Sequence, residues 1–89
     1  MQAHVRRKET FILLELSGRV DDFHSDVVRD ELETILGTGR TRIAIDLGGV
    51  TSLSARCVLD WLAVYERLLQ LGGGIVLIRP RGAALELVQ

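Results

Sequence analysis

The sequence contains one cysteine, one proline and four aromatic residues. A single cysteine, Cys57, excludes an internal disulfide, and with only two histidines it gives too few ligands for a structural zinc site. This sparse cysteine usage fits a reducing compartment, so we expect a cytoplasmic protein. Four aromatic side chains leave no stacking platform for nucleic-acid bases.

An excess of charge of one sign is also lacking. Eleven Lys and Arg residues nearly balance 12 Asp and Glu residues, which gives a formal net charge of −1. Nucleic-acid binders gather basic residues on one face, so we expect no nucleic-acid partner. The apolar runs are far shorter than the ~20 residues that cross a bilayer, so we expect no membrane insertion. Residues 6–8 are basic but precede only four apolar residues, too few for a secretory signal.

The length of 89 residues predicts a single domain, 1–89, because hydrophobic cores divide only in much longer chains. Hydrophobic periodicity divides this domain into strands and helices. Short apolar runs rich in β-branched residues predict strands at 3–7, 11–16, 42–47 and 75–78. Apolar residues spaced three and four apart predict helices at 25–36, 55–71 and 82–89, with glycines following the first two.

The order of these elements predicts the α/β class. Strands that alternate with helices form a mainly parallel sheet, here of four strands, joined by right-handed crossovers. The first strand is connected to the second by only a few residues, so it can only be antiparallel to it. We therefore expect an antiparallel N-terminal edge strand on a mainly parallel sheet.

The long helix predicted at 55–71 carries one continuous apolar stripe. Its expected core face consists of Val58, Trp61, Leu62, Tyr65, Leu68 and Leu69. Leu59 falls outside this stripe, and an apolar residue on the polar face suits contact with a protein partner. Arg56 and Asp60, four residues apart, predict an exposed ion pair on the same helix.

Polar side chains gather at the predicted carboxyl ends of the parallel strands, where open α/β sheets bind ligands and partners. Three loops should meet there, at 18–22, 48–54 and 79–82. These loops and the first turn of the long helix carry carboxylates, hydroxyls and guanidiniums: Asp21, Asp22, Thr51, Ser52, Ser54, Arg56, Arg79 and Arg81. These residues could instead have structural roles and bind nothing. In that alternative, Asp21 or Asp22 lies in a turn or caps a helix, and Ser54 or Ser52 is the helix N-cap.

Residues for catalysis do not come together in the sequence. His4, in an N-terminal arm, and His24 lie far apart, and neither has a nucleophile and a carboxylate at a recognisable spacing. Cys57 lies on the flank of the apolar stripe, which favours an inert buried thiol. Gly72–Gly74 precedes a strand, whereas a phosphate-binding loop follows one. We expect no enzyme activity, no cofactor and no metal.

Three segments, in order, resemble the STAS domain, the fold of bacterial anti-sigma factor antagonists. They are Leu16-Ser-Gly-Arg-Val-Asp21, Ile45-Asp-Leu-Gly-Gly-Val-Thr51 and Leu71-Gly-Gly-Gly-Ile-Val-Leu77. The first is similar to the segment near the start of the family's domain that precedes a helix. The second is similar to the family's Asp-Leu-(Ser/Gly)-Gly-Val segment, and the third to its Gly-Gly turn and fourth strand. The similarity covers about residues 11–89.

The resemblance implies a non-catalytic module that docks on a serine kinase, an anti-sigma factor, and is switched by phosphorylation. The family's switch motif, Asp-Ser-Ser-Gly at the start of the long helix, reads Ser54-Ala55-Arg56-Cys57 here. Ala55 stands where the phosphoserine belongs, so we expect no phosphorylation at that position. Ser54 is the displaced candidate acceptor, because a phosphate there would sit on a helix N-terminus beside Arg56.

Two hypotheses about function follow from the resemblance. In the first, the domain resembles an anti-sigma factor antagonist and docks through Asp21, Ser52, Ser54, Arg56, Leu59 and Arg79. In the second, it is an accessory subunit of an ABC lipid transport system and docks on the transporter ATPase, which does not require the phosphoserine. A third hypothesis, nucleotide binding by the arginines at the carboxyl ends of the strands, ranks last, because no aromatic or glycine-rich cradle supports it. Similar domains have a longer final helix, so the apolar residues of 82–89 predict a homodimer contact or a shortened domain.

Overall fold

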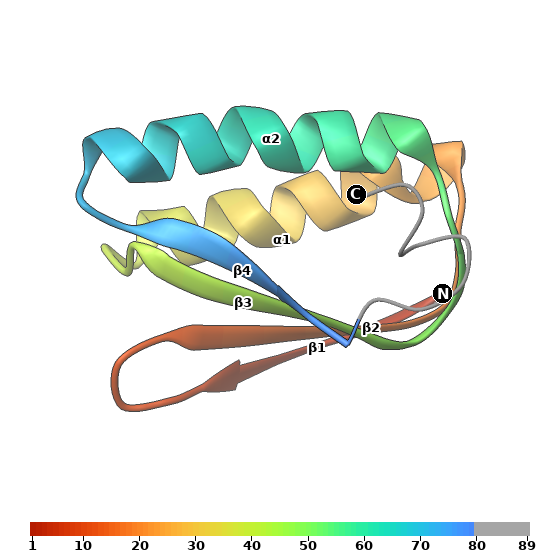
Figure 1. The fold of residues 1–89 in the computed structure, drawn as a ribbon, viewed down its shortest axis with the longest axis horizontal. Coiled ribbons are helices and arrows are strands. Elements are labelled where there is room, and N and C mark those ends of the chain that lie inside the picture. Colours follow the sequence, from red (N-terminus) through yellow and green to blue (C-terminus); the bar gives the residue numbers. More distant parts are fainter. Residues whose placement is uncertain (80–89) are drawn as a thin grey trace.

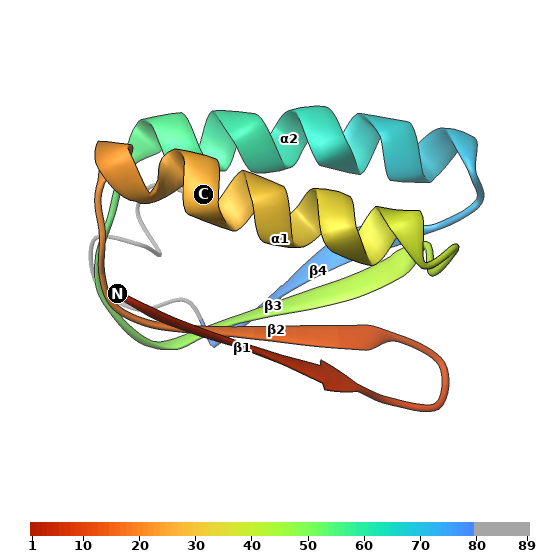
Figure 2. The ribbon, with the colours of Figure 1, turned by 180° about the vertical axis from the view of Figure 1, so that it is seen from behind.

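The fold is a two-layer arrangement of a four-stranded sheet and two helices. The computed structural model describes residues 1–79, so the helix predicted at 82–89 lies outside the described residues. The strands are β1 (Gln2–Arg7), β2 (Ile12–Val20), β3 (Arg42–Leu53) and β4 (Gly74–Ile78), and the helices are the short 3-10 helix η1 (Asp22–His24), α1 (Ser25–Gly37) and α2 (Ala55–Gln70). Both long helices cover the same face of the sheet (Figures 1 and 2).

The sheet has the predicted mixed topology. Its strands lie in the order β1-β2-β3-β4. β1 pairs with β2 in antiparallel orientation, whereas β2–β3 and β3–β4 are parallel pairs. This confirms the α/β prediction with an antiparallel N-terminal edge strand. His4 lies within β1 opposite Glu15, so its assignment to an N-terminal arm was wrong.

The two central strands are longer than predicted. β2 continues past Gly18 to Val20, and β3 continues past Gly48 to Leu53, so the stretches expected as loops are mostly strand. The β2–β3 register shifts at two irregularities in the glycine-containing stretches, and the two strands stay paired beyond them. A Cβ at Gly49 would lie 3.0 Å from Cβ of Ser17, so glycine permits a close approach of the strands here. In Figure 1 these strand ends curve towards the helix layer.

The core lies between the sheet and the helices. On α2 the buried residues are Cys57, Trp61, Val64 and Leu68. Leu62 and Leu69 are 49% and 51% exposed, so their assignment to the core face was wrong. The buried stripe is rotated because one flank of α2 packs against α1 and the other against β4, which leaves only the central positions facing the sheet.

Two polar contacts join α1 to α2 on that flank. The Ser25 hydroxyl donates a hydrogen bond to the Asp60 carboxylate, and Arg67 forms an ion pair with Glu33. Because Asp60 is turned towards Ser25, the predicted Arg56–Asp60 ion pair is not formed. The buried Ser25 is therefore satisfied by a residue of the neighbouring helix.

The glycines after α2 form the tight turn into β4. Gly72 has a φ of +80°, the left-handed conformation in which helices commonly end. At Gly73 an added Cβ would lie 1.8 Å from the carbonyl oxygen of Thr41, a distance no packing adjustment of a side chain can relieve. That same carbonyl accepts a 2.9 Å hydrogen bond from the Gly74 N–H, so the contact also fixes the start of β4.

Alanine at Gly73 is therefore expected to lower the free energy of unfolding by about 3 kcal/mol or more, because the backbone of the turn must move. Gly37 is the matched control, since it is helical and a Cβ there meets nothing within 4 Å. Gly37→Ala should raise the free energy of unfolding by about 0.5–1 kcal/mol. Urea unfolding of both variants tests this pair, and equal effects would contradict the assigned turn geometry.

The Cys57 thiol is fully buried beneath the first turn of α2. Burial is the main reason why its pKa lies above the ordinary value. The thiol therefore stays protonated at pH values at which an exposed thiol begins to ionise. We expect DTNB to label the native protein about tenfold or more slowly than the urea-unfolded chain near pH 8. Equal labelling rates would show that the first turn of α2 opens freely.

Candidate functional site

The candidate site lies at the end of the molecule where β2 and β3 extend beyond β4. The last paired residue of β4, Ile78, lies opposite Asp46, whereas β2 and β3 stay paired up to Val20 and Leu53. α2 begins directly after β3, and η1 directly after β2. We call the residues 19–24 and 51–59 the rim; it contains the two strand ends, η1 and the first turn of α2.

Ser54 is the central residue of the rim. It is the N-cap of α2, and its Oγ accepts a 3.3 Å hydrogen bond from the Cys57 N–H. The same hydroxyl donates to Oδ1 of Asp22, and the Ser54 N–H donates to the carbonyl oxygen of Val20 at 2.8 Å. The structure thus selects Ser54 over Ser52 as N-cap and uses its hydroxyl both as donor and as acceptor.

Asp21 holds η1 against the start of α2. Its backbone N–H donates to Nδ1 of His24 at 3.0 Å, and its carbonyl oxygen lies 3.6 Å from Sγ of Cys57. Its carboxylate lies 3.7 Å from the Arg19 guanidinium. Asp21 is the N-cap residue of η1, as the structural alternative for this aspartate predicted.

Arg56 and Leu59 project from the first turns of α2 into solvent. Leu59 is 65% exposed. Arg56 is exposed as well and forms no hydrogen bond or ion pair with any of residues 1–79. Ser52 differs from both, because its hydroxyl oxygen is buried and has no hydrogen-bond partner in this part of the chain. The rim therefore offers a free cation and an exposed apolar side chain on one helix.

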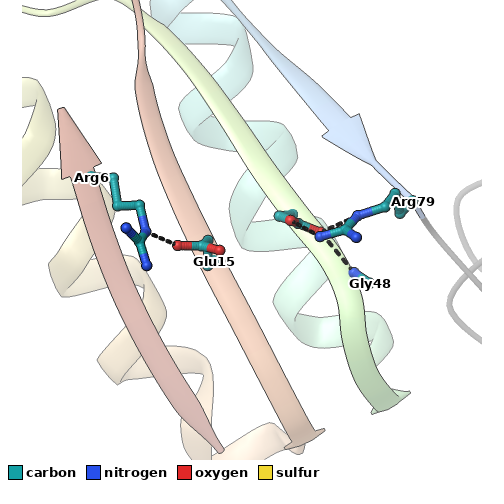
Figure 3. A network of polar contacts seen from close by, with 5 residues as sticks. Arg6, Glu15, Gly48 and Arg79 are labelled. Carbon is teal, nitrogen blue, oxygen red and sulfur yellow. Dashed lines mark hydrogen bonds and ion pairs between the residues drawn. The ribbon is translucent and has the colours of Figure 1, made fainter. Parts of the chain in front are cut away.

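Arg79 lies away from the rim, on the sheet face opposite the helices (Figure 3). Its Nε is 3.2 Å from Oδ1 of Asp46, and its Nη2 also contacts that carboxylate. These hydrogen bonds raise the pKa of the Arg79 guanidinium, which stays charged. Asp46 also accepts a 2.9 Å hydrogen bond from the Gly48 N–H.

A second ion pair lies on the same open face. Arg6 of β1 pairs with Glu15 of β2, next to Asp46 in the sheet register (Figure 3). Both pairs cross between neighbouring strands, and Arg6 and Arg79 keep more than half of their side chains exposed. Such exposed pairs contribute little to stability. Because Arg79 lies on this face, it is separated from the hydroxyl side chains of the rim, with which it was expected to lie.

The rim contains no metal-binding cluster within residues 1–79. No group of three or more His, Cys, Asp and Glu side chains could hold a metal ion there. Over the same residues, no helix is long and apolar enough to span a bilayer.

Five of the six predicted docking positions lie in the rim, and Arg79 lies outside it. Asp21, Ser54, Arg56 and Leu59 lie on neighbouring elements of the rim. Ser52 lies there too but turns its hydroxyl inward, and Arg79 lies on the open face. The sequence did not identify Asp22 as the partner of Ser54, although an acidic residue at the end of a parallel strand was the signal for it. The third predicted loop reaches Arg81, outside the described residues.

Comparison with known proteins supports this fold. The sequence matches the family model described as Mlab, STAS domain, over residues 3–89. A search of the curated proteins finds no match. Among solved structures, the phosphorylated form of SpoIIAA, a Bacillus cell fate determinant, is 17% identical with a TM-score of 0.82, over 99% of this chain and 81% of that one.

Two further structures are similar. A candidate anti-sigma factor antagonist from Thermotoga maritima is 13% identical with a TM-score of 0.88, over 97% of this chain and 74% of that one. An anti-sigma factor antagonist from Mycobacterium paratuberculosis is 22% identical with a TM-score of 0.77, over 96% of this chain and 71% of that one. At such identities these structures establish a shared fold, and the family model extends over nearly the whole sequence. The chain belongs to the STAS domain family.

Proposed function

We propose that this chain is a non-catalytic, cytoplasmic docking module that binds a protein partner through the rim without a phosphoserine switch. The observation that carries the proposal is the state of the Ser54 hydroxyl. It donates to Asp22 and accepts from the Cys57 N–H, so it is a structural cap. The next residue, Ala55, has no hydroxyl to modify.

A phosphate on Ser54 would be opposed by its surroundings. Phosphorylation would break the hydrogen bond to Asp22 and place a group of about −2 charge beside that carboxylate. Arg56 and the N-terminus of α2 favour a phosphate, but the existing cap already satisfies that N-terminus. The rim is therefore fixed in one state, and its docking does not depend on a kinase.

Arg56 and Leu59 are the residues we propose to contact the partner. An exposed apolar side chain beside an unpaired guanidinium resembles the composition of protein–protein contact sites, in which arginine is enriched. The proposed partner is a kinase-like anti-sigma factor, as for the antagonists with this fold. Asp21 and Ser54 support the surface by fixing η1 and the first turn of α2.

A second candidate function is that of an accessory subunit of an ABC lipid transport system, docking on the transporter ATPase. One observation favours it: the position of the switch serine is occupied by Ala55, and this role does not need that serine. Both candidates use the same rim and differ in the identity of the partner.

Pull-down from the native host tests the docking surface. Arg56→Glu and Leu59→Asp should each reduce recovery of the specific partner about tenfold or more, because central contacts dominate binding energy. Leu71→Asp and Arg42→Glu are matched controls at the other end of the molecule; Leu71 is 64% exposed and Arg42 is exposed. A kinase-like anti-sigma factor or a transporter ATPase, recovered with the controls but lost with the rim variants, would support the proposal. Equal loss in all four variants would contradict it.

Phosphate transfer from the recovered partner tests the absence of the switch. Incubation with radiolabelled ATP should leave the wild-type chain unlabelled, and Ser54→Ala should behave in the same way. A matched Ala55→Ser variant shows whether the partner can modify a hydroxyl at the next position. Labelling of the wild type that Ser54→Ala abolishes would overturn the proposal.

A further inference from the structure

The outer face of α1 and η1 carries exposed apolar side chains. Phe23 is 76% exposed and Val27 49% exposed. They are four residues apart, and Asp30 follows three residues later, so the three recur at helical spacing along one face. The buried residues of α1, among them Val28 and Leu32, face the sheet instead.

The segment that contains this face is strongly acidic. Between Asp22 and Gly37 the sequence has five acidic residues and one basic residue, a formal charge of −4 in a chain whose total is −1. Three of these acidic side chains have partners within residues 1–79. Asp22 bonds to Ser54, Asp26 pairs with Arg29, and Glu33 pairs with Arg67. The carboxylates of the remaining two, Asp30 and Glu31, have no such partner in this part of the chain.

Helix stability does not explain these acids. Acidic side chains stabilise the first turn of a helix through its dipole, and on α1 that turn holds Asp26. Asp30 and Glu31 lie in the middle of the helix, where the dipole gives no such gain. Their proximity to Phe23 and Val27 produces an apolar stripe bordered by negative charge.

We propose that this surface, the α1 face formed by Phe23, Asp26, Val27, Asp30 and Thr34, binds a basic amphipathic helix of a partner protein. Apolar side chains of that helix pack on Phe23 and Val27, and its Lys or Arg residues meet Asp30, the acid of this face that is unpaired within residues 1–79. Recognition of a helix by apolar positions at such spacing is a recurring binding mode, and the charge gives its specificity.

The charge also argues for this occupant over others. A negative face repels anionic lipid surfaces and nucleic acids. The helices of a second copy carry three arginines within residues 1–79, of which Arg29 and Arg67 are already paired with Asp26 and Glu33, so that copy offers only Arg56 as an unpaired helical cation and no row of basic residues along one helix. The α1 face therefore shares Phe23 with the rim, extends the contact along α1 and includes neither Arg56 nor Leu59.

The test is an NMR titration of the ¹⁵N-labelled chain with a synthetic amphipathic leucine–lysine peptide, compared with its leucine–glutamate counterpart. Only the lysine peptide should bind, with shifts concentrated in residues 22–34, and added salt should weaken it. Asp30→Lys should raise the Kd about tenfold, and so should Val27→Ser.

Matched controls are Glu66→Lys, an equal charge change at an exposed position of α2, and Leu59→Ser, an equal loss of apolar surface on the rim. Both should bind the peptide like the wild type. Shifts spread over all acidic residues, equal loss in Glu66→Lys or Leu59→Ser, or binding of the glutamate peptide would overturn the proposal. Concentration-dependent shifts of the α1 face without peptide would identify a second copy as its occupant and would overturn it as well.

Discussion

The arrangement of the rim depends on the pairing of β2 with β3 beyond the end of β4. This pairing passes two irregularities and ends with the Ser54 N–H bonded to the carbonyl oxygen of Val20 at 2.8 Å. From there, α2 starts at the Ser54 cap and η1 at Asp21, and the Asp22–Ser54 hydrogen bond joins the two. The hydroxyl of Ser54 is thus a structural junction between three elements, and this is the basis of the proposal that the serine is not a phosphorylation switch.

A rim fixed in this way favours docking by a preorganised surface. Buried contacts, including Cys57 beneath Asp21, hold the first turn of α2, so the backbone that presents Arg56 and Leu59 needs no further ordering. The acidic α1 face lies on the neighbouring helix of the same layer (Figure 2). The sheet face opposite carries Arg6–Glu15 and Arg79–Asp46, pairs that satisfy each other. The helix side therefore has the unpaired groups that a partner can use.

Hydrophobic period was sufficient to predict the order of strands and helices and their topology, because each apolar run has one face that must be buried. It failed at Gly18 and Gly48, where glycine at a strand irregularity has the same sequence signal as glycine in a loop. It also failed at Leu62 and Leu69, since the rotation of α2 is set by its contacts with α1 and β4. The grouping of Arg79 with the rim followed from the same error in strand length, because β3 extends seven residues beyond Asp46.

Site-specific photo-crosslinking in the native host tests the central claim, docking by the rim without a phosphoserine, most directly. A photoreactive amino acid replaces either Leu59 at the rim or Leu71 at the far end of α2, two positions of nearly equal exposure. Docking by the rim predicts one specific protein adduct from position 59 and none from position 71, unchanged in Ser54→Asn, which can still cap α2 but cannot be phosphorylated. An adduct from position 71 alone, or one from position 59 that Ser54→Asn abolishes, would contradict this claim.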